Sequence, residues 1–378
     1  MNFHVIVEMS TGYLILLKTR ISSLSRSLLQ MRKLDFHLCF LLYLSAVKRQ
    51  YLTFLWQEIG ESVIIPFRIS IFMFKGDCYM GDSITLEKKA YAKLNLCLDV
   101  IGEREDGYHF VRMIMQNIDL HDTLYFTLSD EEKDVADVKE LITFSTDSGR
   151  IPSDERNLAF KAAKLMYETY SLKKPIDIRL EKRIPVEAGM AGGSSDAAAV
   201  FHAVNELYGL NAPVEKLMEL GVTIGSDIPF CILGKTALSE GIGEKLTPIT
   251  PLDDCYILVA KPPLSLNTKY IYTNLDHDGD MDHPDVDGMV ESMNNHDLNG
   301  ITRRFGNVLE SVSVKEYREI QAIKATMVVC HSKGALMTGS GPTVFGIFEK
   351  EEHAKQAYAS IEKQGIAENI YITHPVSN

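Results

Sequence analysis

Cysteine is scarce in this sequence, and the cysteines lie far apart. Only six of the 378 residues are cysteine, and the closest two, Cys78 and Cys97, are 19 residues apart. This spacing excludes the CxxC patterns that bind zinc or carry out redox chemistry. Scattered, unpaired cysteines are typical of a reducing compartment, so the sequence predicts a cytoplasmic protein.

Two further features are missing: an excess of positive charge and an apolar run that could cross a bilayer. Asp and Glu number 51 against 39 Lys and Arg, a net charge of −12, whereas nucleic-acid binding needs a basic face. The apolar runs at 38–47 and 63–74 are short and are bounded or broken by His37 or Arg68, and a transmembrane helix needs about 20 apolar residues. We therefore expect neither nucleic acid nor a membrane as a partner.

The rest of the composition is that of a globular protein. Apolar residues make up 46% of the chain and charged residues 24%, which excludes disorder, collagen and disulfide scaffolds for the bulk of the sequence. At about 150 residues per domain, the length predicts two to three domains.

Residues 1–79 differ from the remainder. They carry nine Lys or Arg against five Asp or Glu and hold the single tryptophan, Trp56, but only three of the 25 glycines. The triplet Lys75-Gly76-Asp77 can be encoded by AAAGGAGAT, which contains a bacterial ribosome-binding sequence at a suitable distance from Met80. We expect residues 1–79 to be an extension outside the fold, with Met80 as the true start. A membrane-surface or targeting extension is the alternative.

Hydrophobic periodicity from Met80 onward predicts a mixture of strands and helices. Between 85 and 101 apolar residues alternate with polar ones, such as Leu94 and Leu96 with Lys93 and Asn95, as in a half-buried strand. Further strands are expected at 108–119, 122–128, 176–180, 255–260, 335–338 and 343–348. Helices are expected at 157–170, 194–207, 213–220 and 351–363, and another begins near 314 in the segment up to 330. We expect 276–287 to be an exposed acidic loop and 247–254 to be a domain junction.

The helix at 194–207 has the clearest pattern of all. Its apolar positions 197, 200, 201 and 204 follow the i, i+3, i+4, i+7 spacing of one helix face. Ser194 or Ser195 can cap its start, and Gly209 can end it.

A glycine-rich segment precedes this helix and is the most informative part of the sequence. Gly189, Gly192 and Gly193 can adopt positive φ and let backbone N–H groups approach a ligand. Ser194 and Ser195 add hydroxyl donors, and the helix start adds free N–H groups and the positive end of its dipole. The segment therefore predicts an anion site suited to a polyphosphate. A tight strand-to-helix turn is the alternative.

Three common nucleotide-binding patterns do not describe this segment. No Lys-Ser or Lys-Thr follows the glycines, so it is not a Walker A loop. The G-x-G-x-x-G pattern of dinucleotide-binding proteins is absent, and so are the H-R-D and D-F-G motifs of protein kinases.

The segment resembles the signature of the GHMP kinases, a family of small-molecule kinases. Four other blocks resemble motifs of this family in the expected order, at 89–96, 106–109 with 115–116, 225–230 and 337–345. The second block, Asp-Gly-Tyr-His, resembles the subfamily that phosphorylates 4-diphosphocytidyl-2-C-methylerythritol in isoprenoid precursor biosynthesis. The resemblance runs from about 84 to about 375. Two positions depart from the family pattern: Tyr91 replaces Pro, and Ala191 replaces Gly.

The resemblance implies an α+β fold of two domains. Residues 80–248 would form the ribosomal-protein-like ATP-binding domain, and 249–378 the ferredoxin-like C-terminal domain. ATP would be the co-substrate, with Mg²⁺ implied by the chemistry, and the acceptor a small cytidyl molecule. The metal ligands cannot be assigned from the sequence. We expect a monomer or a homodimer.

The resemblance also implies roles for individual residues. Asp227 would accept the proton of the acceptor hydroxyl, and Lys93 would support it and the transferring phosphoryl group. Asn95, on the same strand face, would bind substrate. The alternatives from local sequence are a helix cap for Asp227 and a solvated strand lysine for Lys93.

The other implied contacts are with the two nucleotides. Tyr108 and His109 would hold the cytidine, the alternative being an exposed turn. The turn of Gly339, Ser340 and Gly341 would lie near substrate and phosphates, or be a tight turn only. The residues placed at ATP are Asn157, Lys182, Pro185, Val186, Glu187, Ala188, Gly189, Met190, Ala191, Gly192, Gly193, Ser194 and Ser195.

Two other functions stay open at this point. One is another GHMP reaction, of the homoserine or mevalonate type, against which the Asp-Gly-Tyr-His block argues. The other is a catalytically silent nucleotide-binding relative, against which the presence of both Lys93 and Asp227 argues.

Overall fold

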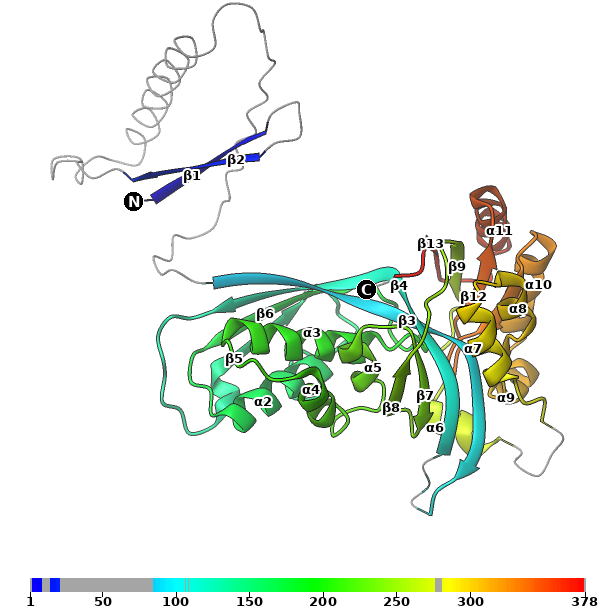
Figure 1. Ribbon diagram of the computed structural model, residues 1–378, viewed down its shortest axis with the longest axis horizontal. Helices are drawn as coiled ribbons and strands as arrows, with labels where there is room; N and C mark the ends of the chain where they lie inside the picture. The colour runs from blue at the N-terminus through cyan, green and yellow to red at the C-terminus, as the bar shows by residue number, and fades with distance from the viewer. Residues whose placement is uncertain are drawn as a thin grey trace, which may run out of the picture. The chain divides into compact units, whose positions relative to one another are not determined.

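The protein is described by a computed structural model in two separate units, Met1–Tyr79 and Met80–Asn378 (Figure 1). The described residues are 2–8, 14–20, 84–105, 107, 109–275 and 281–376. In the first unit, strand β1 (Asn2–Glu8) pairs antiparallel with β2 (Leu14–Arg20). Every predicted site residue belongs to the second unit, and of these residues Tyr108 lies outside the described ones.

Two long strands organise the second unit. β3 (Ile84–Glu103) and β4 (His109–Leu128) pair antiparallel along nearly their whole length. Around them the larger sheet has the order β10-β3-β4-β6-β5, with β7 pairing β4 and β8 pairing β7. The added strands are β5 (Ile142–Thr146), β6 (Ile176–Glu181), β7 (Ala237–Gly241), β8 (Lys245–Pro248) and β10 (Gly306–Asn307).

The two strands predicted at 108–119 and 122–128 are one continuous strand, so that prediction is wrong. Tyr91 pairs with His121, but the next residue of β3, Ala92, pairs with Ile118. Asp119 and Leu120 are therefore extra residues of a bulge, which interrupts the alternation of apolar and polar residues. The bulge also divides the edge of β4 between β6, which pairs with residues 123–128, and β7, which pairs with 111–115.

Helices cover one face of the β6 end of this sheet (Figure 1). They are α2 (Leu158–Tyr170), α3 (Gly192–Leu207), α4 (Val214–Gly221) and α5 (Ile228–Leu233). Their apolar faces meet the sheet in a core that includes Phe126, Tyr167, Ile178 and Phe201, each fully buried. The predicted helices at 157–170, 194–207 and 213–220 are confirmed.

The start of α3 differs from the prediction. The helix begins at Gly192, its N-cap residue is Ala191, and no side chain caps it. The hydroxyl of Ser195 instead donates to the carbonyl oxygen of Tyr91, 2.6 Å away. Ser194 and Ser195 thus lie in the first turn, because Ala191 makes the turn into the helix with a φ of 56°. Gly209, with a φ of 59°, follows the helix end as predicted.

A second, antiparallel sheet has the order β11-β12-β9-β13. Its strands are β9 (Tyr256–Lys261), β11 (Gly334–Met337), β12 (Val344–Phe348) and β13 (Asn369–Thr373). The accompanying helices are α6 (Thr268–Thr273), α7 (Val286–Asn294), α8 (Leu298–Arg303), α9 (Glu310–Glu316), α10 (Arg318–Val329) and α11 (Glu351–Gln364), and the short helix η2 (Val138–Leu141) precedes β5.

Two predictions in this region need correction. The helix predicted to begin near 314 is instead the end of α9, and the extended backbone of Tyr317 separates it from α10, which fills most of the segment up to 330. Helix α7 starts at Val286, inside the predicted loop 276–287. Residues 276–280 of that loop lie outside the described residues.

The two sheets share a hydrophobic core. Val111 and Phe230 from the first half of the unit pack in one cluster with Leu258 and Val344 from the second half. The predicted boundary between 248 and 249 therefore stays a prediction, because residues 80–378 form one compact unit. Within the described residues, no helix has both the length and the apolarity that crossing a bilayer requires.

We expect Ala191→Gly to raise the free energy of unfolding by about 0.5–1 kcal/mol, because glycine adopts a positive φ without the steric cost of a Cβ atom. The matched control is Ala359→Gly, at an exposed position inside α11, which should lower the free energy of unfolding by about 1 kcal/mol. Denaturant unfolding followed by circular dichroism measures both. Equal destabilisation by the two substitutions would contradict a left-handed Ala191.

Candidate active site

Strand β3 carries a buried lysine to the centre of the site. The ammonium of Lys93 donates to Asn95 Oδ1 at 2.7 Å and to the carbonyl oxygen of Gly189 at 2.9 Å. Lys93 and Asn95 share a face because they are two residues apart on the strand. A lysine that is only 4% exposed must have such partners, since burying an unpaired charge is costly.

Asp227 provides the opposite charge. Its carboxylate lies 4.0 Å from the ammonium of Lys93, and its side chain is 34% exposed. Asp227 occupies the N-cap position of α5, as the alternative interpretation anticipated, yet its side chain makes no capping hydrogen bond. The carboxylate is therefore directed to Lys93 and to solvent, where a hydroxyl group of a bound ligand can reach it.

The glycine-rich segment has a regular backbone alternation. Positive φ occurs at every second residue, at Glu187 (55°), Gly189 (71°) and Ala191 (56°). An alternation of left-handed with ordinary conformations turns successive N–H groups toward one side and forms an anion-binding concavity. The concavity continues into the free N–H groups at the start of α3. Phosphate groups are the ligands that such an arrangement favours.

A second turn from the other sheet packs directly against this segment. A Cβ atom on Gly189 would lie 2.5 Å from the carbonyl oxygen of Thr338, and one on Gly339 would lie 3.0 Å from the carbonyl oxygen of Gly189. Both glycines are needed because the two backbones are in contact. A Cβ atom on Gly339 would also lie 3.4 Å from the Lys93 ammonium. This turn therefore borders the part of the site where Lys93 lies.

The turn is held by residues that the sequence did not single out. Asn307 donates its amide N–H groups to the carbonyl oxygens of Met337 and Gly339, at 2.8 Å each. Thr338 accepts the backbone N–H of Asn95 on its hydroxyl, at 3.0 Å. No motif marks Asn307, because its role depends on β10 pairing with β3 far away in the sequence.

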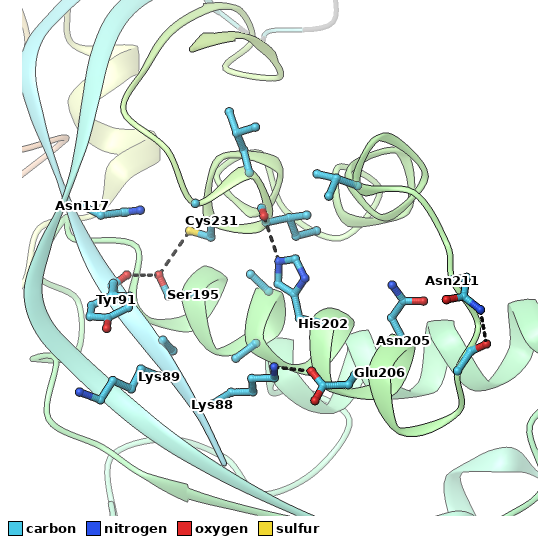
Figure 2. Close-up of a pocket in the computed structure, with 18 residues that line it drawn as sticks. Lys88, Lys89, Tyr91, Asn117, Ser195, His202, Asn205, Glu206, Asn211 and Cys231 are labelled. Carbon is cyan, nitrogen blue, oxygen red and sulfur yellow. Dashed lines mark hydrogen bonds and ion pairs between the residues drawn. The ribbon is translucent and has the colours of Figure 1, made fainter. Parts of the chain in front are cut away.

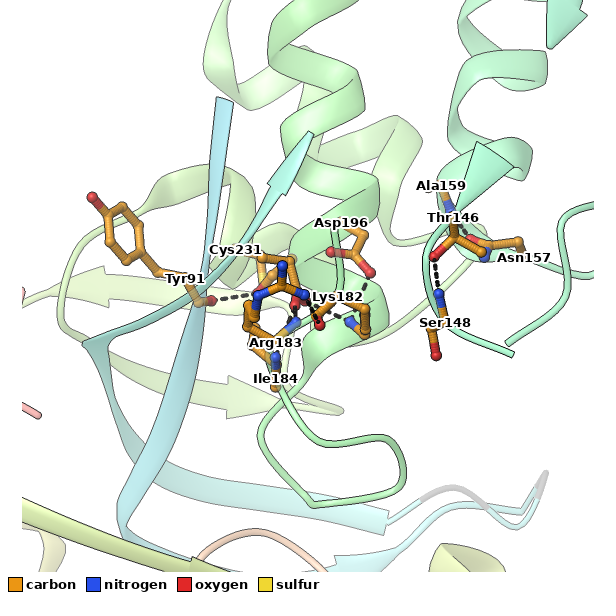
Figure 3. A network of polar contacts seen from close by, with 12 residues as sticks. Tyr91, Thr146, Ser148, Asn157, Ala159, Lys182, Arg183, Ile184, Asp196 and Cys231 are labelled. Carbon is orange, nitrogen blue, oxygen red and sulfur yellow. Dashed lines mark hydrogen bonds and ion pairs between the residues drawn. The ribbon is translucent and has the colours of Figure 1, made fainter. Parts of the chain in front are cut away.

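Lys182 lies in a buried triad with Asp122 and Asp196, and Figure 3 shows it beside Asp196. Its ammonium donates to Asp122 at 2.5 Å and to Asp196 at 2.9 Å. The other oxygen of Asp122 accepts the backbone N–H groups of Arg183 and Ile184. The triad thus joins β4 to both ends of the glycine-rich segment. Asp122 and Asp196 were not predicted, since they are far from each other in sequence.

Burial dominates the electrostatics of this triad. It raises the pKa of the Asp196 carboxyl, an effect that the nearby Lys182 charge opposes. Burial also opposes the charge on Lys182, but the two carboxylates together outweigh it and hold the pKa of the ammonium above its usual value. One oxygen of Asp196, Oδ1, has no hydrogen-bond partner in the described part of the chain.

Asn157 has a local structural role. Its Oδ1 accepts the backbone N–H of Ala159 at 2.9 Å, and its Nδ2 donates to the carbonyl oxygen of Pro152 at 2.8 Å. The side chain caps α2 and is only 8% exposed. Contacts of Asn157 and Lys182 with adenine therefore stay predictions, and both side chains are already engaged within the protein.

His109 lies beside an aromatic residue that the sequence analysis missed. The rings of His109 and Tyr272, from α6, have centroids 5.0 Å apart and are tilted by 44°. Burial raises the pKa of the Tyr272 hydroxyl, and the negative charge of Asp227 adds to the shift. Tyr272 therefore packs beside His109 and lies within reach of the negative charge of Asp227.

The structure thus brings most of the predicted residues together. Lys93, Asn95 and Asp227 meet at the glycine-rich segment, and the turn at 339–341 closes against it. Ser340 contacts Thr268 through hydroxyl groups 2.8 Å apart.

Comparisons with known proteins agree with this arrangement. The family described as GHMP kinases N terminal domain matches residues 157–235, and that described as GHMP kinases C terminal matches 281–367. The chain is 48% identical over 270 residues to the 4-diphosphocytidyl-2-C-methyl-D-erythritol kinase of Lachnoclostridium phytofermentans, covering 71% of this chain and 90% of that one. It is 45% identical to the enzyme of the same name from Lachnospira eligens, covering 76% and 98%.

Solved structures give the same result. A crystal structure of 4-(cytidine 5'-diphospho)-2C-methyl-D-erythritol kinase matches with a TM-score of 0.64 and 29% identity, covering 78% of this chain and 100% of that one. A homoserine kinase from Cytophaga hutchinsonii shares the fold, with a TM-score of 0.60, 18% identity, and 81% and 98% covered. This chain therefore belongs to the GHMP kinase family and, within it, to the 4-diphosphocytidyl-2-C-methyl-D-erythritol kinases.

Proposed function

We propose that this chain transfers the γ-phosphoryl group of ATP to the 2-hydroxyl of 4-diphosphocytidyl-2-C-methyl-D-erythritol. The observation that carries the proposal is the meeting of Lys93, Asp227 and the glycine-rich segment at one point. Phosphoryl transfer requires a bound triphosphate, a positive charge beside the transferred phosphoryl group and an acceptor for the proton of the substrate hydroxyl. These three parts correspond to the segment at 185–195, to Lys93 and to Asp227.

In the proposed step, the substrate 2-hydroxyl oxygen forms a bond to the γ-phosphorus, and the bond between that phosphorus and the β–γ bridging oxygen breaks. ADP leaves with the electron pair of the broken bond, and the hydroxyl proton passes to the carboxylate of Asp227. Lys93 lies between the carbonyl oxygen of Gly189 and the carboxylate of Asp227, where its charge stabilises negative charge developing on the phosphoryl oxygens.

The backbone N–H groups of the glycine-rich segment would hold the phosphates of ATP. The triad of Asp122, Lys182 and Asp196 supports this role, because it fixes both ends of the segment without using solvent-exposed side chains. We assign these three residues to positioning the segment.

Mg²⁺ would accompany the ATP phosphates, neutralising part of their charge. Among the described residues no group of three or more His, Cys, Asp or Glu side chains is arranged to hold a metal ion. Mg²⁺ in kinases is bound largely by phosphate oxygens and water, with one or two carboxylates.

His109 and Tyr272 would hold the cytidine. Two rings 5.0 Å apart offer a face for a base to stack on and an imidazole that can hydrogen-bond to its edge. Tyr108 is proposed with them on the resemblance alone. The Asn95 amide, beside Lys93, would contact the methylerythritol unit.

We also propose that the enzyme is cytoplasmic and acts as a monomer or homodimer. The cysteines of the described part of the chain, Cys97, Cys231, Cys255 and Cys330, are all free thiols, as expected of a reducing compartment.

The proposed reaction predicts ADP release with ATP, Mg²⁺ and the cytidyl substrate, and none with homoserine or mevalonate. Asp227→Asn should lower kcat by about 10²–10⁴-fold through loss of the proton acceptor, while ATP affinity stays within about twofold. Asp130→Asn, at an exposed carboxylate elsewhere, is the matched control. Turnover of homoserine or mevalonate would indicate another GHMP reaction, and ATP binding without any turnover a silent relative. Wild-type kcat in Asp227→Asn would remove this residue from the mechanism.

Lys182→Met should lower the free energy of unfolding by about 3–5 kcal/mol, because it leaves two buried carboxylates without their cation. The pKa of Asp196 is already raised by burial. A carboxyl with a raised pKa in the folded state binds its proton more readily when folded, so its contribution to stability declines as the pH rises through that pKa. The free energy of unfolding that Lys182→Met loses should therefore be larger at pH 8 than at pH 6.

Denaturant midpoints at the two pH values measure this effect. Lys161→Met, at an exposed lysine of α2, is the control and should show neither the loss nor the pH dependence. In activity assays without denaturant, Lys182→Met should raise KM for ATP by a larger factor than it lowers kcat. An unchanged KM for ATP would argue against a positioning role for the triad.

Tyr272→Leu should raise KM for the cytidyl substrate by about tenfold, since base stacking on an aromatic ring is worth about 1–3 kcal/mol. KM for ATP should change less than twofold. Tyr270→Leu, an exposed tyrosine on the same helix, is the matched control and should change neither constant. An effect confined to KM for ATP would contradict the assignment of Tyr272 to the cytidine.

A further inference from the structure

A fully buried lysine, Lys261, takes no direct part in the proposed reaction. It is the last residue of β9 and is only 1% exposed. Its ammonium donates to the carbonyl oxygens of Pro262 and Leu264, at 3.3 and 3.0 Å, and to the carboxylate of Glu368 at 3.3 Å. Since a buried charge is costly unless it is paired and hydrogen-bonded, the side chain depends on these three partners.

The partners of Lys261 are of two kinds. The side chain of Glu368 is 41% exposed and also lies 3.4 Å from Arg150, so water can solvate this carboxylate when the lysine is absent. The two carbonyl groups belong to the segment that follows β9. There the backbone N–H of Leu264 donates to the carbonyl oxygen of Pro262 at 2.7 Å. The ammonium therefore fixes a tight turn at the base of this segment.

The segment, residues 262–267, then runs to one of the turns that border the site. Leu266 packs on this turn, since a Cβ atom on Gly341 would lie 3.1 Å from the Cδ1 atom of Leu266. Thr268, the first residue of α6, lies 2.8 Å from the hydroxyl of Ser340. The segment thus connects the buried ammonium with the turn at 339–341 and with the start of α6.

Helix α6 depends on such contacts because it is short. It has six residues, whereas an isolated helix of fewer than about 12 residues is marginal in water. Ile271 is fully buried and fixes one side of the helix, and the next residue, Tyr272, lies beside His109. The path by which the chain enters α6 therefore helps to set the position of the Tyr272 ring.

We propose that Lys261 is a positioning residue for the acceptor substrate. Its bonds to the two carbonyl oxygens fix the segment 262–267, and the segment holds α6 where Tyr272 can contact the cytidine. Lys261 is too deeply buried to touch a substrate itself. This inference rests on the proposed function, in which His109 and Tyr272 hold the cytidine.

Lys261→Met removes the cation and keeps an unbranched side chain of similar length. It should raise KM for the cytidyl substrate about five- to tenfold, because the substrate then has to order the segment on binding. Its kcat and its KM for ATP should stay within about twofold of the wild type, since the segment at 185–195 is untouched. Steady-state kinetics with each substrate varied in turn measure these constants.

Two control variants separate the role of the carbonyl bonds from that of charge. Glu368→Gln removes the ion pair but leaves the bonds of Lys261 to both carbonyl oxygens, so it should leave both KM values and kcat unchanged. Lys89→Met removes an exposed lysine of β3, which Figure 2 shows pointing away from α3 and α5. It should also leave the three constants unchanged.

Hydrogen exchange followed by mass spectrometry gives a readout that needs no turnover. In Lys261→Met, peptides covering 262–275 should exchange faster than in the wild type, and peptides covering 185–195 should exchange at the same rate. Failure of the proposed function would show as absent turnover in the wild type, whereas failure of this inference would show in the variants of an active wild type.

Ser265→Gly tests the same segment without altering a buried group. Ser265 is exposed, and glycine gives the backbone more conformational freedom, so KM for the cytidyl substrate should rise about two- to threefold with KM for ATP unchanged. This variant decides the proposal if circular dichroism shows that Lys261→Met is unfolded.

Three results would overturn the proposal. One is an unchanged KM for the cytidyl substrate in folded Lys261→Met, or in Ser265→Gly where Lys261→Met is unfolded. Another is an equal rise of KM for ATP, which would indicate a general loss of structure. The third is an equal effect of Glu368→Gln, which would assign the effect to the ion pair and not to the carbonyl bonds.

Discussion

The site depends on the interactions that the buried ammonium of Lys93 makes. It is buried, and its three neighbours come from three parts of the fold: Asn95 from the same strand, the carbonyl oxygen of Gly189 from the glycine-rich segment, and the carboxylate of Asp227 from the start of α5. A cation held in this way orders its surroundings, since each partner lost leaves a buried charge less well compensated. The glycine-rich segment and the carboxylate are thereby kept at a fixed separation.

The second sheet completes this arrangement through main-chain contact. Gly189 and Gly339 approach so closely that neither could carry a Cβ atom without a shift of the backbone. Asn307 then fixes the turn at Gly339 from β10, which is itself paired with β3. The two halves of the kinase unit are joined at the site by backbone atoms, and by a shared hydrophobic core elsewhere.

Local signals in the sequence predicted the parts of the site that are contiguous. The alternation around Lys93 and Asn95 predicted their common face, and the glycines at 189–193 predicted a loop with positive φ before a helix, which the structure contains. Anion binding by this loop stays a prediction. The bulge at Asp119 and Leu120 was read as a break between strands, because a local pattern cannot distinguish the two.

Contacts between distant residues could not be predicted in this way. The triad of Asp122, Lys182 and Asp196 joins positions up to 74 residues apart, and each alone resembles an ordinary charged surface residue. Asn307 depends on a strand of two residues that no periodicity reveals. Tyr272 becomes a candidate only when α6 places it beside His109.

In the glycine-rich segment the main chain and the side chains have different roles. Residues at positive φ, such as Gly189 and Ala191, alternate with Ala188 and Met190, whose side chains are buried in the core. The proposed binding of phosphate by N–H groups would leave those side chains free to anchor the segment. Contacts through N–H groups do not fix the side chain at Ala191, so an alanine can stand there at positive φ, whereas Gly189 is restricted by the backbone packed against it.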